Sequence, residues 1–152
     1  MKLLIVEDNL TLAKCTAQLL WRLDRPAQQL EAITIASDLQ TALLGLSGHD
    51  AVLCDGAFPL SRDSRFAVEK WHVVRREARA RGMHFVLYSG SVQALDCARE
   101  SGTVALAKPA ATEEIYAALM DYSHPVIRRG YEKPAWTIDG GTGAGVNHIS
   151  GP

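Results

Sequence analysis

Short runs of apolar residues alternate along the chain with longer segments in which apolar residues recur every three or four positions. The short runs lie at 3–6, 51–54, 85–88 and 104–107, and none of them alternates apolar with polar residues. Continuous runs of this length are typical of parallel strands that are buried on both faces of a sheet. A fifth strand is predicted at 32–36, where β-branched residues are enriched.

The segments between these strands have helical periodicity. Asn9 or Thr11 could cap the first helix, and Ser37 and Asp38 precede the second. Three further helices are predicted at about 64–81, from Val92 to about Ala98, and from Thr112 to about Tyr122. The positions expected to face the core include Leu12, Thr16, Leu19, Leu20, Leu23, Leu43, Phe66, Val74, Val92, Leu95, Ile115 and Leu119.

The order of these elements, strand then helix repeated five times, indicates the fold class. Short connections of this kind imply right-handed crossovers and a doubly wound α/β architecture. We therefore expect a five-stranded parallel sheet in a flavodoxin-like order, with helices on both faces, over residues 1–123. Residues 124–152 are expected to form a partly flexible tail, in which the apolar cluster at 131–138 either docks or stays disordered.

Composition and charge narrow the class of protein. With 152 residues, 47% hydrophobic and 22% charged, the chain has the composition of one globular domain. A formal net charge of −1 provides no general field for nucleic acid or an anionic membrane. No apolar run reaches the ~18 residues of a membrane span, and no signal peptide is indicated. Cys15, Cys54 and Cys97 lack the spacing of a zinc site. We expect a cytoplasmic, single-domain protein.

Polar residues follow four of the five predicted strands. Glu7 and Asp8 come after the first strand, Asp55 after the third, Ser89 ends the fourth, and Lys108 follows the fifth. In an open α/β sheet the functional crevice lies outside the carboxyl ends of the strands. We therefore expect three carboxylates, one hydroxyl and one ammonium group to lie along the same edge.

These residue types favour metal-assisted phosphoryl transfer. Three adjacent carboxylates repel one another unless they share a cation, and a few hard oxygen ligands suit Mg²⁺. A lysine beside them can hold a phosphoryl anion, and a serine hydroxyl can add a hydrogen bond. No glycine-rich loop follows the first strand, which argues against a bound dinucleotide. The pattern predicts a phosphoryl acceptor whose nucleophile is a carboxylate.

The same motifs resemble the receiver domain of two-component response regulators. They are Ile5-Val6-Glu7-Asp8-Asn9, Leu53-Cys54-Asp55 with Pro59 four residues later, Tyr88-Ser89-Gly90, and Ala107-Lys108-Pro109. Each motif is weak alone, but the four occur in order at the ends of strands one, three, four and five. The resemblance covers about residues 1–123.

The resemblance implies a role for each residue. Asp55 would be the phosphoacceptor, and Glu7, Asp8 and Asp55 would hold Mg²⁺ with the backbone carbonyl of Ala57. Ser89 and Lys108 would contact the phosphoryl group, and the Lys108–Pro109 bond would be cis. The donor would be a histidine kinase or a histidine phosphotransfer protein. The output would be a protein contact near the fourth helix, last strand and last helix, without direct DNA binding; a homodimer is left open.

The chain departs from the family in two places. Ala105 stands where the family often has an aromatic residue that follows the hydroxyl residue toward the phosphate, and Tyr88 or Tyr116 could take that role. The segment 60–66 lacks the common Asp-Gly pair, and the connection from Asp55 to Ser89 is long. An unusual third helix or entry loop is therefore expected.

Three other interpretations compete with this one. A degenerate receiver could bind proteins without phosphorylation, which Ala105 favours. A small aspartyl phosphatase would need a second aspartate at the position of Ala57, so no enzymatic activity beyond self-phosphorylation and dephosphorylation at Asp55 is expected. Four arginines at 75–81 could bind nucleic acid, but Glu69 and Glu77 alternate with them and favour a solvated helix face.

Overall fold

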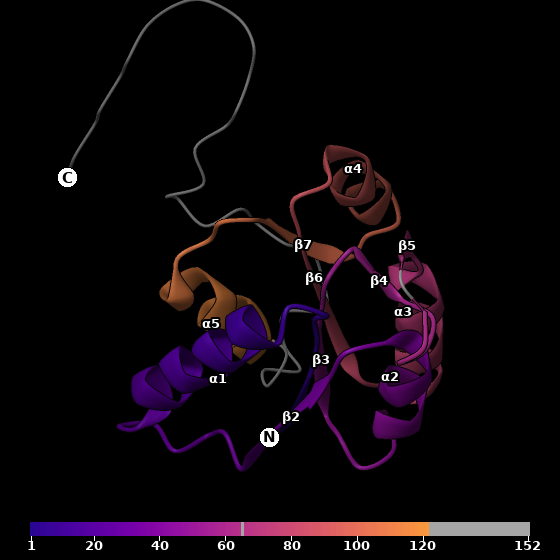
Figure 1. Cartoon of the computed structure of the whole chain (residues 1–152). Helices are drawn as coiled ribbons and strands as arrows, with labels where there is room; N and C mark the ends of the chain where they lie inside the picture. Colours follow the sequence, from indigo (N-terminus) through magenta and orange to yellow (C-terminus); the bar gives the residue numbers. More distant parts are fainter. Residues whose placement is uncertain (65, 122–152) are drawn as a thin grey trace, which may run out of the picture.

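The computed structural model describes residues 1–64 and 66–121. Its main sheet has five parallel strands in the order β2-β1-β3-β6-β7. Helices α1 and α5 cover one face of this sheet, and α2, α3 and α4 cover the other (Figure 1). The predicted doubly wound sheet in flavodoxin-like order is confirmed.

The strands of the main sheet lie close to their predicted positions. They are β1 (Lys2–Val6), β2 (Ala32–Ala36), β3 (Ala51–Cys54), β6 (His84–Ser89) and β7 (Val104–Ala107). The three central strands are almost fully buried, as continuous apolar runs predict. The prediction was wrong for β7, which is only half-buried because it lies at the edge of the sheet.

Capping side chains begin three of the five helices. Asn9 accepts a hydrogen bond from the Leu12 amide, Asp38 from the Thr41 amide and Ser91 from the Ala94 amide. The helices are α1 (Leu10–Asp24), α2 (Leu39–Gly45), α3 (Trp71–Ala80), α4 (Val92–Glu100) and α5 (Thr112–Met120).

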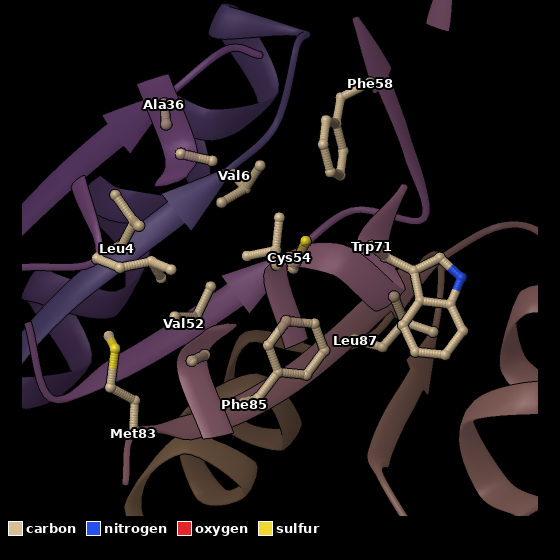
Figure 2. Packing of buried hydrophobic residues seen from close by; sticks show 14 of the residues in the cluster. Leu4, Val6, Ala36, Val52, Cys54, Phe58, Trp71, Met83, Phe85 and Leu87 are labelled. Atoms are coloured by element: carbon tan, nitrogen blue, oxygen red, sulfur yellow. The ribbon is translucent and has the colours of Figure 1, made fainter. Parts of the chain in front are cut away.

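Two apolar clusters hold the helices onto the sheet. One cluster packs β-strand residues such as Leu3, Ile5 and Val86 against α1 and α5. The other, drawn in Figure 2, lies under α2, α3 and α4 and contains Phe58 and Trp71. Two expected core positions in the helices are exposed: Leu19 in α1 by 45% and Val92 in α4 by 71%. Both residues lie outside the helix face that packs on the sheet. In α1 that face buries Ala13, Thr16 and Leu20, and in α4 it buries Ala94, Leu95 and Ala98.

A β-hairpin occupies the segment where the sequence predicted an unusual entry to the third helix. Strand β4 (Ala57–Pro59) pairs antiparallel with β5 (Ala67–Glu69), and Ala57 lies opposite Glu69. The prediction that a helix starts near Ser64 was therefore wrong, because α3 starts at Trp71. Phe66, expected on a buried helix face, is 81% exposed, whereas Phe58 is fully buried.

The predicted C-terminal tail lies outside the described residues, and so does its apolar cluster at 131–138. Within the described part of the chain, no helix combines the length and the apolar character needed to span a membrane.

A buried carboxylate ties α1 to α5. Asp24, 2% exposed, accepts hydrogen bonds from the amides of Gln29 and Leu30 and from the Tyr116 hydroxyl at 2.7 Å. Burial raises the pKa of Tyr116 to about 12, and its hydrogen bond to Asp24 and the charge of that carboxylate act in the same direction. Burial alone would raise the pKa of Asp24, but these hydrogen bonds outweigh it and lower the pKa.

Tyr116→Phe is expected to lower the free energy of unfolding by about 1.5–3 kcal/mol near neutral pH, because it removes a hydrogen bond to a charged group. The raised pKa stabilises the fold below the usual tyrosine value of 10, and this contribution is lost as the pH rises toward about 12. The difference between wild type and variant should therefore shrink over that interval in urea unfolding. A difference that stays constant across it would contradict the prediction.

Candidate functional site

Three carboxylates meet at the carboxyl edge of the sheet. Glu7 and Asp8 follow β1, Asp55 follows β3, and one oxygen of each lies within 4.8 Å of the others. The two strands pair directly, with Val6 opposite Cys54, so the residues after them are brought side by side. Glu7 is buried, Asp55 is half-buried and Asp8 is exposed, which leaves the cluster open to solvent on one side.

Lys108 reaches this cluster from the loop after β7. Its Nζ lies 2.6 Å from Glu7 Oε2 and 3.2 Å from Asp55 Oδ1. The Lys108 amide also donates to the Ser89 carbonyl, which extends the pairing of β6 and β7 up to the site. The Lys108–Pro109 peptide bond is cis, as the resemblance implied.

Burial and neighbouring charges shift the ionisation of both members of the ion pair. Burial raises the pKa of Glu7, and the charge of Asp55 raises it further, while the hydrogen bond from Lys108 opposes both. Burial would lower the pKa of Lys108, but the hydrogen bond to Glu7 and the two carboxylate charges outweigh it and raise the pKa. Lys108 therefore stays a cation that compensates part of the negative charge.

The charges and donor atoms of the cluster fit Mg²⁺. Three carboxylates and one ammonium group carry −3 and +1, which leaves a net charge of −2 when all are ionised. A divalent cation balances this charge, and oxygen donors are the ligands Mg²⁺ prefers. Glu7, Asp8 and Asp55 would hold the ion. The Ala57 carbonyl, one residue beyond Gly56 in the hairpin, stays a prediction as a further ligand.

Ser89 borders the site from the end of β6. It is 2% exposed, and its Oγ accepts a hydrogen bond from the Ser91 amide at 3.1 Å. Gly56, the residue after the acceptor, lies against the Ser89 side chain, and the Gly56 amide donates to Asp55 Oδ1 at 2.6 Å. Ser91 in turn donates through its hydroxyl to Glu69 Oε1 at 2.9 Å, which connects the start of α4 to the hairpin. Sequence reasoning gave neither Gly56 nor Glu69 a role at this site, and it placed Glu69 on the face of the third helix, whereas Glu69 ends β5.

Tyr88 and Tyr116 do not lie on the face of the sheet that holds Ser89 and Ala105. Ser89 and Leu87 are directed to the face of the sheet under α2, α3 and α4, where Ala105 also packs. Tyr88 is directed to the opposite face, and its hydroxyl lies 3.4 Å from the Ala110 amide. Tyr116 is bonded to Asp24 at the end of α1. Tyr88 faces away from Ser89 because strand alternation sends neighbouring residues to opposite faces. That one of the two tyrosines takes the role of the missing aromatic residue stays a prediction.

Two other sequence features have structural explanations. The thiol of Cys54 is fully buried beside Asp55, and burial holds its pKa well above 9.0, so it remains neutral and unreactive. The arginines of α3 contact the protein itself. Arg75 and Arg79 donate to the carbonyls of Ser101 and Gly102, and Arg76 and Arg81 pair with Glu77, as a solvated helix face predicts.

Comparisons with known proteins agree with this geometry at the level of the fold. No family model and no curated protein matches the chain, but many solved structures do. A CheY-like response regulator receiver domain from Methylobacillus flagellatus is 26% identical, with a TM-score of 0.60 over 80% of this chain and 97% of that one. SdrG from Sphingomonas melonis Fr1 is 23% identical, with a TM-score of 0.56 over 79% of this chain and 96% of that one. The signal receiver domain of NarL from Mycobacterium tuberculosis is 17% identical, with a TM-score of 0.61 over 80% and 94%.

The fold and the position of the carboxylate cluster thus define a class of protein. The described part of the chain is a receiver domain of the CheY-like fold. In this structure a β4–β5 hairpin follows the candidate acceptor, and a small residue, Ala105, lies in β7.

Proposed function

We propose that the chain is a phosphoacceptor signalling protein of a two-component phosphorelay. A histidine kinase or a histidine phosphotransfer protein would donate the phosphoryl group, and Asp55 would accept it. An Asp55 oxygen attacks phosphorus, the bond from phosphorus to the donor nitrogen breaks, and an acyl phosphate forms. Bound Mg²⁺ would supply positive charge next to the phosphoryl oxygens.

The observation that carries this proposal is the set of contacts made by the Asp55 carboxylate. Within the described residues, both polar contacts of the Asp55 side chain are made by Oδ1, one with the Gly56 amide and one with Lys108. The other oxygen is left available as the nucleophile. Lys108 is close enough to pair with the negative charge of the transferred phosphoryl group, because its ammonium group already lies beside the acceptor.

A degenerate receiver that binds proteins without phosphorylation is the second candidate function. Ala105 favours it, because a small side chain stands at the position where the family often has the aromatic residue that follows the hydroxyl residue. The intact cluster of Glu7, Asp8, Asp55 and Lys108 opposes it. A signalling contact near α4, β7 and α5 would serve either function.

Phosphoryl labelling with a small donor distinguishes the two functions. Incubation with a small phosphodonor and Mg²⁺ is expected to add one acid-stable, base-labile phosphoryl group, detected by intact mass. Excess EDTA should abolish the label. Asp8→Ala should lower the affinity for Mg²⁺ by at least about 10-fold and suppress labelling with it. Labelling that persists undiminished in EDTA would refute the metal-dependent mechanism, and no labelling of wild type would favour the degenerate receiver.

A further inference from the structure

Position 56 has room only for glycine, because any side chain there would displace Ser89. A Cβ atom built on Gly56 would overlap Ser89 Oγ, and it would lie 3.1 Å from Ser89 Cβ and 3.6 Å from Ala94 Cβ. Gly90 follows Ser89 in the sequence, and a Cβ atom added to Gly90 would have nothing within 4 Å. The crowding is therefore specific to position 56.

The backbone does not explain this glycine. The described glycines with positive φ are Gly48, Gly82 and Gly102, so the conformation of Gly56 is one that other residues adopt. Gly56 is thus required for space, at the point where the acceptor strand passes the end of β6.

Ser89 has little freedom to withdraw. The Lys108 amide donates to its carbonyl at 2.9 Å, and Ser91, two residues later, caps α4. The Ser89 hydroxyl accepts a hydrogen bond from the Ser91 amide at 3.1 Å, and Ser89 is almost completely buried. A side chain at position 56 would therefore turn the Ser89 hydroxyl out of its place rather than shift the whole residue.

We propose that Gly56 is a positioning residue that sets the place of the Ser89 hydroxyl beside the acceptor. This inference rests on the proposed function and on the role that the resemblance implies for Ser89, a contact with the transferred phosphoryl group. The missing side chain lets the hydroxyl lie directly against the residue that follows Asp55. Gly56 also acts on the acceptor itself, since its amide holds Asp55 Oδ1.

A double-mutant cycle tests the proposal with the rate of labelling by a small phosphodonor. Gly56→Ala is expected to slow labelling by about 10- to 100-fold, as misplacement of a reacting group does. Its Mg²⁺ affinity should be unchanged, because Glu7, Asp8 and Asp55 are untouched. Ser89→Ala should slow labelling to a similar extent. The double variant should be no slower than Ser89→Ala alone, because no hydroxyl remains to be displaced.

Gly90→Ala is the matched control, and it should label like wild type. If Gly56→Ala does not fold, the double variant should recover folding, since the overlapping oxygen is gone. Labelling of Gly56→Ala at the wild-type rate, or a full additional loss in the double variant, would overturn the positioning role. A wild-type protein that takes no label would instead overturn the proposed function, and the positioning role with it.

Discussion

Asp55→Asn is expected to abolish phosphoryl labelling to below detection while the fold remains intact. The amide has almost the same shape as the carboxylate, and its oxygen can still accept from the Gly56 amide as Asp55 Oδ1 does at 2.6 Å. An amide oxygen, however, cannot form the acyl phosphate. Intact mass after incubation with a small phosphodonor and Mg²⁺ measures the loss, and circular dichroism checks the fold.

Asp63→Asn is the matched control for this variant. Asp63 is exposed in the loop of the neighbouring hairpin, so the same chemical change there should leave labelling at the wild-type level. Equal labelling of Asp55→Asn and wild type would remove Asp55 as the acceptor, whatever the control shows.

Phe58→Ala is expected to lower the free energy of unfolding by about 3–5 kcal/mol, which is a large share of the stability of a domain of this size. Phe58 is fully buried in the cluster under α2, α3 and α4, and Figure 2 shows its ring directed from β4 toward Val6 and Cys54. Its removal leaves a cavity at the base of the hairpin. Urea unfolding followed by far-ultraviolet circular dichroism measures the change.

The second phenylalanine of the same hairpin serves as the control. Phe66 is 81% exposed, so Phe66→Ala should change the free energy of unfolding by no more than about 0.5 kcal/mol. Similar losses for the two variants would show that the hairpin is not anchored through Phe58.

The hydrophobic pattern by itself determined the sheet and the edge at which the polar residues meet. Continuous apolar runs of this length are typical of strands in a parallel sheet, and the alternation with helices sets their parallel direction. Glu7, Asp8, Asp55 and Lys108 each follow such a run, so their convergence follows from strand direction alone. For this reason the sequence could predict the carboxylate cluster that the structure contains.

Only the tertiary structure decided what lies between Asp55 and Trp71. Phe66 fits a helical period, and the sequence contains nothing that tells which of Phe58 and Phe66 finds a cavity in the core. The hairpin forms because β4 lies against the top of the sheet and buries Phe58, and such long-range packing overrides local periodicity. The contact between position 56 and the Ser89 hydroxyl joins residues 33 positions apart. The two residues are close because the ends of β3 and β6 and the start of α4 approach one another in space. A local sequence pattern does not predict such an approach.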